Sequence, residues 1–343
     1  MTAQADVGYQ ARQHGRWQWS EAAFWVLVLA CAFLFPSRYL IMTEIVRLAL
    51  FALSLDLILG YAGIVSLGHA AFFGVGAYCA GLLALHGIIN EPVIALVVAG
   101  LAAMAVGFLT SFLVIRGADL TRLMVTLGIA LLLEALAERF SNITGGTDGL
   151  QGIEMQPILG LFAFDMFGRT GLFYTLAVLF LLFLLARRVV HSPFGLSLRA
   201  IRNNPLRAAA IGIPVNRRLI AIYTLSAFYA GIAGALFTQT TALASLDVFA
   251  FERSADLMLM LVIGGTGYLY GGLIGAVVFK ILQELFSTIT PQYWQFWIGL
   301  VLVVMVLVGR ARIHRWALFV PNLIIRQVAG RKAVVALTDN EAP

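Results

Sequence analysis

The polar residues that could act on a substrate lie in one glycine-rich segment, Asp56–Tyr78. Asp56 is an acidic residue in the middle of an apolar run, and Ser66 and His69 follow it between five glycines. Glycine at this density permits sharp turns and close helix contacts. In transporters, broken helices also present backbone donors and carbonyls to polar substrates. The segment therefore predicts either a substrate path or a tight cytoplasmic turn followed by a packing face. The residues of the candidate path are Asp56, Gly60, Gly63, Ser66, Gly68, His69, Phe72 and Gly76.

Asp56 is the most unusual of these residues, because a charged group inside a membrane helix costs about 2.5–3.5 kcal/mol on insertion scales. No basic residue lies three or four positions away from it. We expect its carboxylate to accept a structural hydrogen bond from the glycine turn. A role in substrate binding or gating is the alternative.

Other signatures of chemistry are missing from the sequence. It contains no Gly-Lys dipeptide and hence no Walker phosphate loop, and it has no His-Glu-x-x-His or Gly-x-Ser-x-Gly motif. Its five histidines are scattered, and Cys31 and Cys79 are far apart, so no metal site or disulfide is expected. We therefore predict a protein that is not an enzyme and that binds neither a metal nor a cofactor.

The composition indicates that membrane-spanning helices hold these residues in place. Of 343 residues, 61% are hydrophobic and 12% are charged, whereas soluble chains carry about 25% charged residues. In lipid every backbone group must be paired internally, and the apolar runs lack the alternation of barrel strands. We predict an all-α integral membrane protein with about ten transmembrane helices, each near 20 residues, some of them broken. The candidate spans are 22–36, 41–60, 69–86, 93–115, 121–140, 170–186, 219–240, 254–265, 272–286 and 294–309.

The arginines set the predicted orientation. The 187–218 loop carries seven arginines and no acid, and the tail after Arg310 is also basic, whereas the alternate loops are acidic. Positive residues favour the cytoplasmic side, so both termini are expected inside. The predicted organisation is a cytoplasmic segment (1–20), one transmembrane domain (21–310) containing the cytoplasmic loop 187–218, and a cytoplasmic basic tail (311–343).

Four segments, in the same order, resemble the membrane subunits of branched-chain amino-acid ABC importers, the Liv-type permeases. They are the Asp56–Tyr78 segment, an outer glycine loop, a cytoplasmic loop and a late glycine turn. The last three read Thr144-Gly-Gly-Thr-Asp-Gly-Leu-Gln-Gly-Ile153, Ser192-Pro-Phe-Gly-Leu-Ser-Leu-Arg-Ala-Ile-Arg-Asn-Asn-Pro-Leu-Arg-Ala-Ala-Ala-Ile-Gly-Ile213 and Gly264-Gly-Thr-Gly-Tyr-Leu-Tyr-Gly-Gly272.

This resemblance implies a permease subunit in the bacterial inner membrane. Its partners would be cytoplasmic ATPases that hydrolyse ATP, a second homologous permease and an external substrate-binding protein. In the family the cytoplasmic loop includes a short helix that docks into the ATPase. The arginines of this loop also serve to set the topology, which is compatible with docking. The loop departs from the family by lacking an acidic residue. The residues carried over to the coupling loop are Arg199, Ala200, Arg202, Ala208, Ala209 and Gly212.

The remaining glycines have less specific interpretations. The outer loop either contacts the binding protein or is a solvated connector, and its candidate residues are Gly145, Gly146, Thr147, Asp148 and Gly149. Small residues four apart predict close helix packing in two runs, Ala227, Gly231 and Ala235 and Gly267, Gly271 and Gly275, and Gly264 is assigned to the same packing. Gly60, Gly63 and Gly68 recur at a fixed offset as Gly264, Gly267 and Gly272, which we interpret as coincidence.

Two further questions stay open. An ion-coupled secondary carrier would also have many spans and glycine breaks, but would need Asp56 or His69 to bind its coupling ion. The expected substrate is a branched-chain or other hydrophobic amino acid, with urea, short amides or aromatic acids as the alternative.

Overall fold

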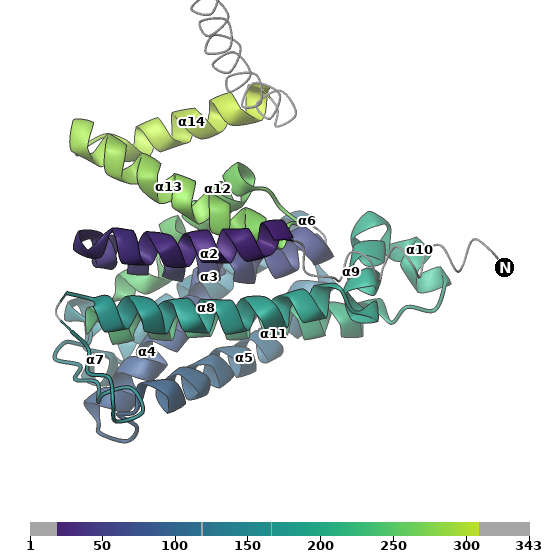
Figure 1. The fold of residues 1–343 in the computed structure, drawn as a ribbon. Helices are drawn as coiled ribbons and strands as arrows, with labels where there is room; N and C mark the ends of the chain where they lie inside the picture. The colour runs from purple at the N-terminus through teal and green to yellow at the C-terminus, as the bar shows by residue number, and fades with distance from the viewer. Residues whose placement is uncertain (1–18, 118, 166, 309–343) are drawn as a thin grey trace, which may run out of the picture. The chain divides into compact units, whose positions relative to one another are not determined.

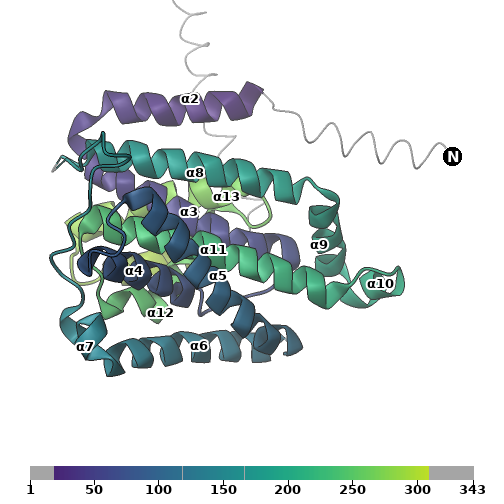
Figure 2. The same ribbon diagram turned by 90° about the horizontal axis from the view of Figure 1, so that it is seen from below.

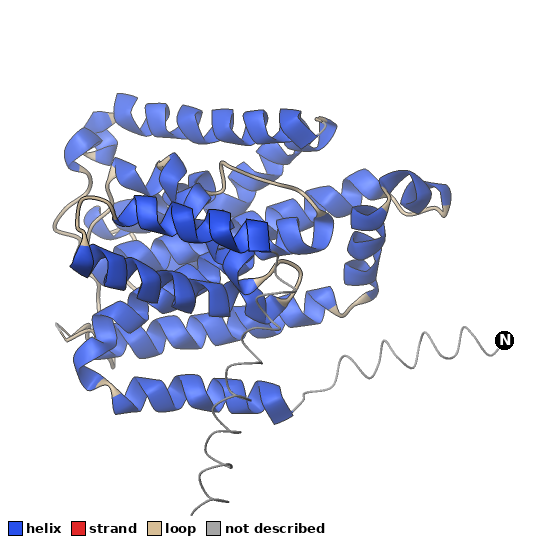
Figure 3. Cartoon of the chain, turned by 90° about the horizontal axis from the view of Figure 1, so that it is seen from above, coloured by secondary structure: helices blue, strands red, loops and turns tan. Residues whose placement is uncertain are grey.

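The computed structural model describes residues 19–117, 119–165 and 167–308, which form helices joined by loops (Figures 1 and 3). Residues 1–18 and the predicted tail, 311–343, lie outside the described residues. The helices are α2 (Trp19–Leu34), η1 (Pro36–Arg38), α3 (Tyr39–Ala62), α4 (Ala70–Leu85), α5 (Pro92–Arg116), α6 (Asp119–Arg139), α7 (Ser141–Thr144), η2 (Gly146–Asp148), α8 (Arg169–Val190), α9 (Pro193–Asn203), α10 (Pro205–Ala210), α11 (Val215–Thr241), η3 (Leu246–Phe249), α12 (Phe251–Gly264), α13 (Leu269–Ile289) and α14 (Trp294–Val308).

The all-helical prediction is confirmed for the described residues, and each of the ten predicted spans overlaps one α-helix, although 22–36 runs past the end of α2 to Pro36 of η1. Six helical segments there are long and apolar enough to cross a membrane. They are Pro36–Ala62, Pro92–Arg116, Leu120–Arg139, Arg169–Val190, Val215–Thr241 and Leu269–Ile289. Helices α2 and α4 contribute shorter apolar segments. The chain is therefore a multi-pass membrane protein, while the count of ten crossings and the orientation stay predictions.

Helices α3 and α11 form the core. Both are buried along most of their length, and α11 packs against α3, α4 and α5 (Figure 2). Helix α6, by contrast, is mostly exposed. Since both kinds of helix are apolar, hydrophobicity alone does not distinguish the buried helices from the exposed one.

Local sequence determines where several helices begin and end. Helix α3 ends because Gly63 adopts φ +74°, and the Ile64 N–H donates to the Ile58 carbonyl at 3.0 Å, as in a Schellman ending. Helix α9 begins with Pro193 in its first turn. Helix α10 begins with Pro205 after Asn204, whose side chain accepts the Arg207 N–H at 2.9 Å.

The described residues up to Lys280 form one unit, and those from Ile281 form a second. The boundary falls inside α13. The candidate functional residues of every class lie in the first unit.

Candidate functional site

The end of α3, the turn before α13 and helix α9 of the predicted cytoplasmic loop meet at one point. The Gly267 N–H donates to the Asp56 carboxylate at 2.7 Å, across 211 residues of sequence. The Arg202 guanidinium of α9 donates to the Gly60 carbonyl. We call Asp56, Gly60, Gly63, Arg202 and Gly267 the glycine junction. The expected hydrogen bond of Asp56 to a glycine turn is thus present, but the turn is the late one and not its own.

Glycine is required at three positions of the junction. A Cβ at Gly60 would overlap the Asp56 carboxylate and lie 2.5 Å from the Gly267 nitrogen. Gly63 and Gly267 have φ of +74° and +81°, and a Cβ on either would crowd Arg202. The two turns that share the same glycine spacing are therefore also in direct contact, through Gly60 and Gly267.

An arginine-rich cavity of about 610 Å³ opens beside the junction. Arg199 lies over the Tyr61 ring, 5.4 Å from its centroid, and Arg187 pairs with Glu21 at 2.8 Å. A displacement of α9 would therefore also move the end of α3 and the turn before α13, because Arg202 contacts both. This arrangement is suited to transmitting movement from α9 to the membrane helices. No group of three or more metal-ligating side chains occurs among the described residues.

The other coupling-loop residues lie on α9, α10 and the turn that follows. Helix α9 buries Leu198 and Ile201 against the bundle, and α10 buries Ala208. Ala209 and Gly212 are exposed, and Ala200 is half-buried. Helix α10 lies beyond the ends of α8 and α11 (Figure 1). Leu206 of α10 and Ile211, which directly follows that helix, are large apolar residues that are 84% and 70% exposed. Exposed apolar side chains beside arginines are typical of a surface that binds another protein.

His69 and its neighbours lie inside the bundle and not at the junction. His69 is fully buried, its Nε2 lies 2.8 Å from the Ser54 hydroxyl, and the Ser226 hydroxyl donates to the Ser54 carbonyl at 2.5 Å. Ser66 and Phe72 are also buried. A substrate path through these residues stays a prediction. The serines that contact His69 were missed, because nothing in the sequence relates positions 54, 69 and 226.

Several glycines are held against the backbone of a neighbouring segment. A Cβ at Gly68 would overlap the Thr126 carbonyl, and one at Gly76 would overlap the Gly231 carbonyl. In the α12–α13 hairpin, Gly264 lies against Gly271, and Gly275 lies against the Met260 carbonyl. The glycines predicted to pack on one helix face are Gly267, Gly271 and Gly275. Gly267 precedes α13, so only Gly271 and Gly275 lie on that helix.

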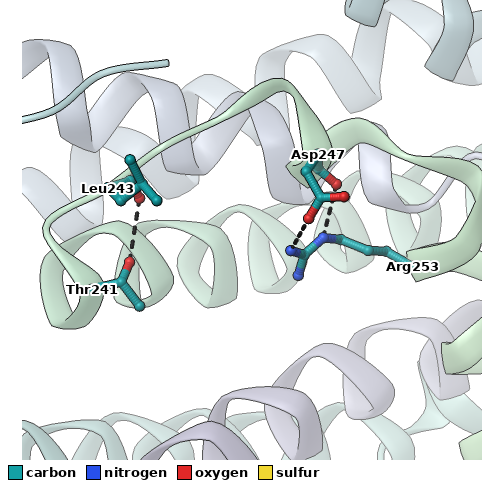
Figure 4. Close-up of polar contacts among 4 residues, drawn as sticks. All are labelled: Thr241, Leu243, Asp247 and Arg253. Carbon is teal, nitrogen blue, oxygen red and sulfur yellow. Dashed lines mark hydrogen bonds and ion pairs between the residues drawn. The ribbon is translucent and has the colours of Figure 1, made fainter. Parts of the chain in front are cut away.

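The outer glycine loop is attached to the segment between α11 and α12. Leu150 and Ala244 exchange two backbone hydrogen bonds, at 2.7 and 3.1 Å. Within the 241–253 segment, Arg253 binds the Asp247 carboxylate at 2.6 Å and its carbonyl at 2.9 Å (Figure 4). In the glycine loop itself, Gly146 and Gly149 are buried, while Gly145, Thr147 and Asp148 are exposed. A contact of this loop with a binding protein stays a prediction.

Comparison with known proteins identifies relatives over most of the chain. The family described as branched-chain amino acid transport system / permease component matches residues 38–307. The LivM high-affinity branched-chain amino acid permease protein of Escherichia coli is 27% identical over 276 residues, which cover 74% of this chain and 64% of the relative. The chain thus matches less than two thirds of that relative's length.

Two further relatives come from Methanocaldococcus jannaschii. A probable branched-chain amino acid permease protein LivH is 30% identical over 254 residues, or 70% of this chain and 77% of the relative. A probable LivM is 28% identical over 273 residues, or 68% and 76%. No solved structure matches the chain.

Proposed function

This chain belongs to the family of permease components of branched-chain amino acid transport systems, and we propose that it is a membrane subunit of an ATP-binding-cassette importer in the bacterial inner membrane. In this role it forms part of the translocation path and leaves ATP hydrolysis to separate cytoplasmic subunits. The substrate class is branched-chain or other hydrophobic amino acids, in line with the names of the relatives. Urea, short amides and aromatic acids are not favoured by these names.

The observation that carries the proposal is the glycine junction. A subunit driven by a separate ATPase needs a mechanical connection from its cytoplasmic surface to its membrane helices. Arg202 and Gly60 supply that connection, and Leu206 and Ile211 supply an exposed apolar surface for the ATPase. Similarity to both LivM and LivH relatives supports a pair of homologous permeases, with an external protein delivering the substrate.

Affinity purification of the tagged chain from native membranes in mild detergent tests the assembly. We expect an ATPase and a second permease to co-elute in roughly equal amounts. Proteoliposomes containing this complex should take up leucine only when ATP is inside and the binding protein is outside. A chain that elutes alone and moves leucine on an ion gradient would contradict the proposal.

Asp56 separates an ATP-driven importer from an ion-coupled carrier. Asp56→Asn keeps an oxygen that accepts the Gly267 N–H, so we expect uptake within about twofold of the parent, or roughly 0.4 kcal/mol. An ion-coupled carrier would lose uptake in the same variant, because the charge that binds its coupling ion is gone.

Asp56→Ala removes the acceptor and leaves the Gly267 N–H without this partner, at a cost of about 1–3 kcal/mol. It should therefore lower the thermal unfolding midpoint measured in detergent. Ser111→Ala is the matched control, because buried Ser111 donates only to the Phe108 carbonyl of its own helix among the described residues. A carrier is indicated if Asp56→Asn abolishes uptake at normal membrane levels.

A further inference from the structure

A second cavity, the outer pocket, lies at the opposite end of the bundle from the glycine junction. It encloses about 430 Å³ between the start of α3, the end of α11 and the loop from Ile153 to Asp165. Small-molecule sites enclose about 300–1,000 Å³, whereas one water occupies about 30 Å³. The cavity is therefore large enough for a small organic ligand.

Two buried polar side chains of the outer pocket retain unused hydrogen-bonding capacity. Arg47 is 8% exposed and Gln239 is 4% exposed. Within the described part of the chain, the Arg47 Nε–H donor and the Gln239 Oε1 acceptor have no hydrogen-bond partner. A buried polar group without a partner is unfavourable, so a ligand that pairs with both groups recovers the lost hydrogen-bond free energy.

The contacts of these side chains fix their orientation. Arg47 Nη1 donates to the Thr240 hydroxyl at 2.9 Å and to the Phe237 carbonyl at 3.3 Å. The Gln239 amide nitrogen donates to the Pro92 carbonyl at 2.8 Å, which leaves the Oε1 of the same amide as the group available to a ligand. The pocket thus presents a cationic donor, Arg47 on α3, and a neutral acceptor, Gln239 on α11, and these two helices pack against each other.

The remaining lining completes a site for a ligand with both charges. Glu44 lines the pocket and pairs with Lys280 at 2.6 Å, with 39% of its side chain exposed. Ile41, Met155 and Phe164 supply apolar surface. The charged lining residues are Arg47, Glu44 and Asp165, so the wall offers both a cation and carboxylates, which favours a ligand that itself carries both charges. The apolar residues favour a ligand with a hydrophobic side chain.

We propose that the outer pocket binds a free amino acid with an apolar side chain as its zwitterion. Arg47 receives the carboxylate, Gln239 Oε1 and Glu44 receive the ammonium group, and Ile41, Met155 and Phe164 surround the side chain. The inference rests on the proposed function and extends it. It gives this chain its own amino-acid site, distinct from that of any external binding protein.

The full chain in lipid nanodiscs, assayed with tritiated leucine by scintillation proximity, tests the proposal. We expect saturable binding that unlabelled leucine displaces. Two analogues should compete at least about tenfold more weakly, corresponding to about 1.4 kcal/mol. They are 3-methylbutylamine, which lacks the carboxylate, and 4-methylpentanoate, which lacks the ammonium group. Equal competition by either analogue would overturn the assignment of a zwitterion.

Variants locate the binding. Gln239→Leu should weaken leucine binding at least about tenfold. Gln151→Leu, at an exposed glutamine of the outer loop, should leave it unchanged. Arg47 is buried beside Phe237, so its replacement could disturb the fold. Leucine binding by Arg47→Gln is therefore compared with the parent only if the variant remains monodisperse. Arg169→Gln, at an exposed arginine, is its control. Saturable binding that Gln239→Leu does not change would place the ligand elsewhere and refute the proposal.

The failure of this inference and that of the proposed function are distinguishable. If the purified complex takes up leucine with ATP and binding protein while the chain in nanodiscs shows no saturable binding, the outer-pocket site is wrong and the importer stands. If the complex transports no amino acid under those conditions, the proposed function itself fails.

Discussion

Gly76→Ala is expected to abolish the accumulation of folded protein. The new Cβ would overlap the Gly231 carbonyl, where the backbones of α4 and α11 meet in the core. Overpacking a core costs about 1–3 kcal/mol, and a clash with backbone, which cannot rotate away, belongs at or above the upper end. Against a total stability of about 5–15 kcal/mol, this loss is severe. Fluorescence-detected size-exclusion chromatography of the solubilised membranes measures the folded fraction.

Gly128→Ala is the matched control, because Gly128 lies within α6 and a Cβ there would meet nothing within 4 Å in the described residues. It should leave the chromatogram unchanged or raise the unfolding temperature slightly, since alanine favours a helix by up to about 1 kcal/mol over glycine. The pair also separates the two interpretations of Gly76. If Gly76→Ala protein is folded and monodisperse but fails in transport, Gly76 acts in the substrate path and the packing explanation is wrong.

Leu206→Asp is expected to detach the chain from the proposed ATPase partner. Leu206 is 84% exposed on α10, and burying a carboxylate in an apolar interface leaves a charge without compensation. Interface hot spots contribute about 2 kcal/mol or more, so affinity should fall at least about thirtyfold. The measurement is the amount of ATPase that co-elutes with the tagged chain, together with ATP-driven uptake of leucine.

Leu161→Asp serves as the control for this experiment. Leu161 is a leucine of similar exposure, 78%, in the outer loop between α7 and α8. The same substitution there should leave co-elution of the ATPase intact. Equal recovery of the ATPase with Leu206→Asp and with the parent would show that α10 does not form the docking surface.

The helices could be predicted from the sequence because their cause is local. Lipid leaves backbone groups no external partner, so each long apolar run must form a helix wherever it packs. The starts of α9 and α10 follow from Pro193 and from Asn204 with Pro205, which fix the first turns by their own geometry. Asp56 was recognised as anomalous for the same kind of reason, since the cost of a buried charge depends on its immediate surroundings.

The partners of these residues were decided by the tertiary structure alone. Asp56 binds Gly267 across 211 residues, and Gly76 lies against Gly231. In a membrane helix all faces are apolar, so the pattern of hydrophobic residues does not tell which face meets which neighbour. Which helices meet depends instead on where glycines allow one backbone to pack directly against another. The helices and the family resemblance can therefore be predicted from the sequence, whereas the glycine junction and the outer pocket exist only because distant helices pack together.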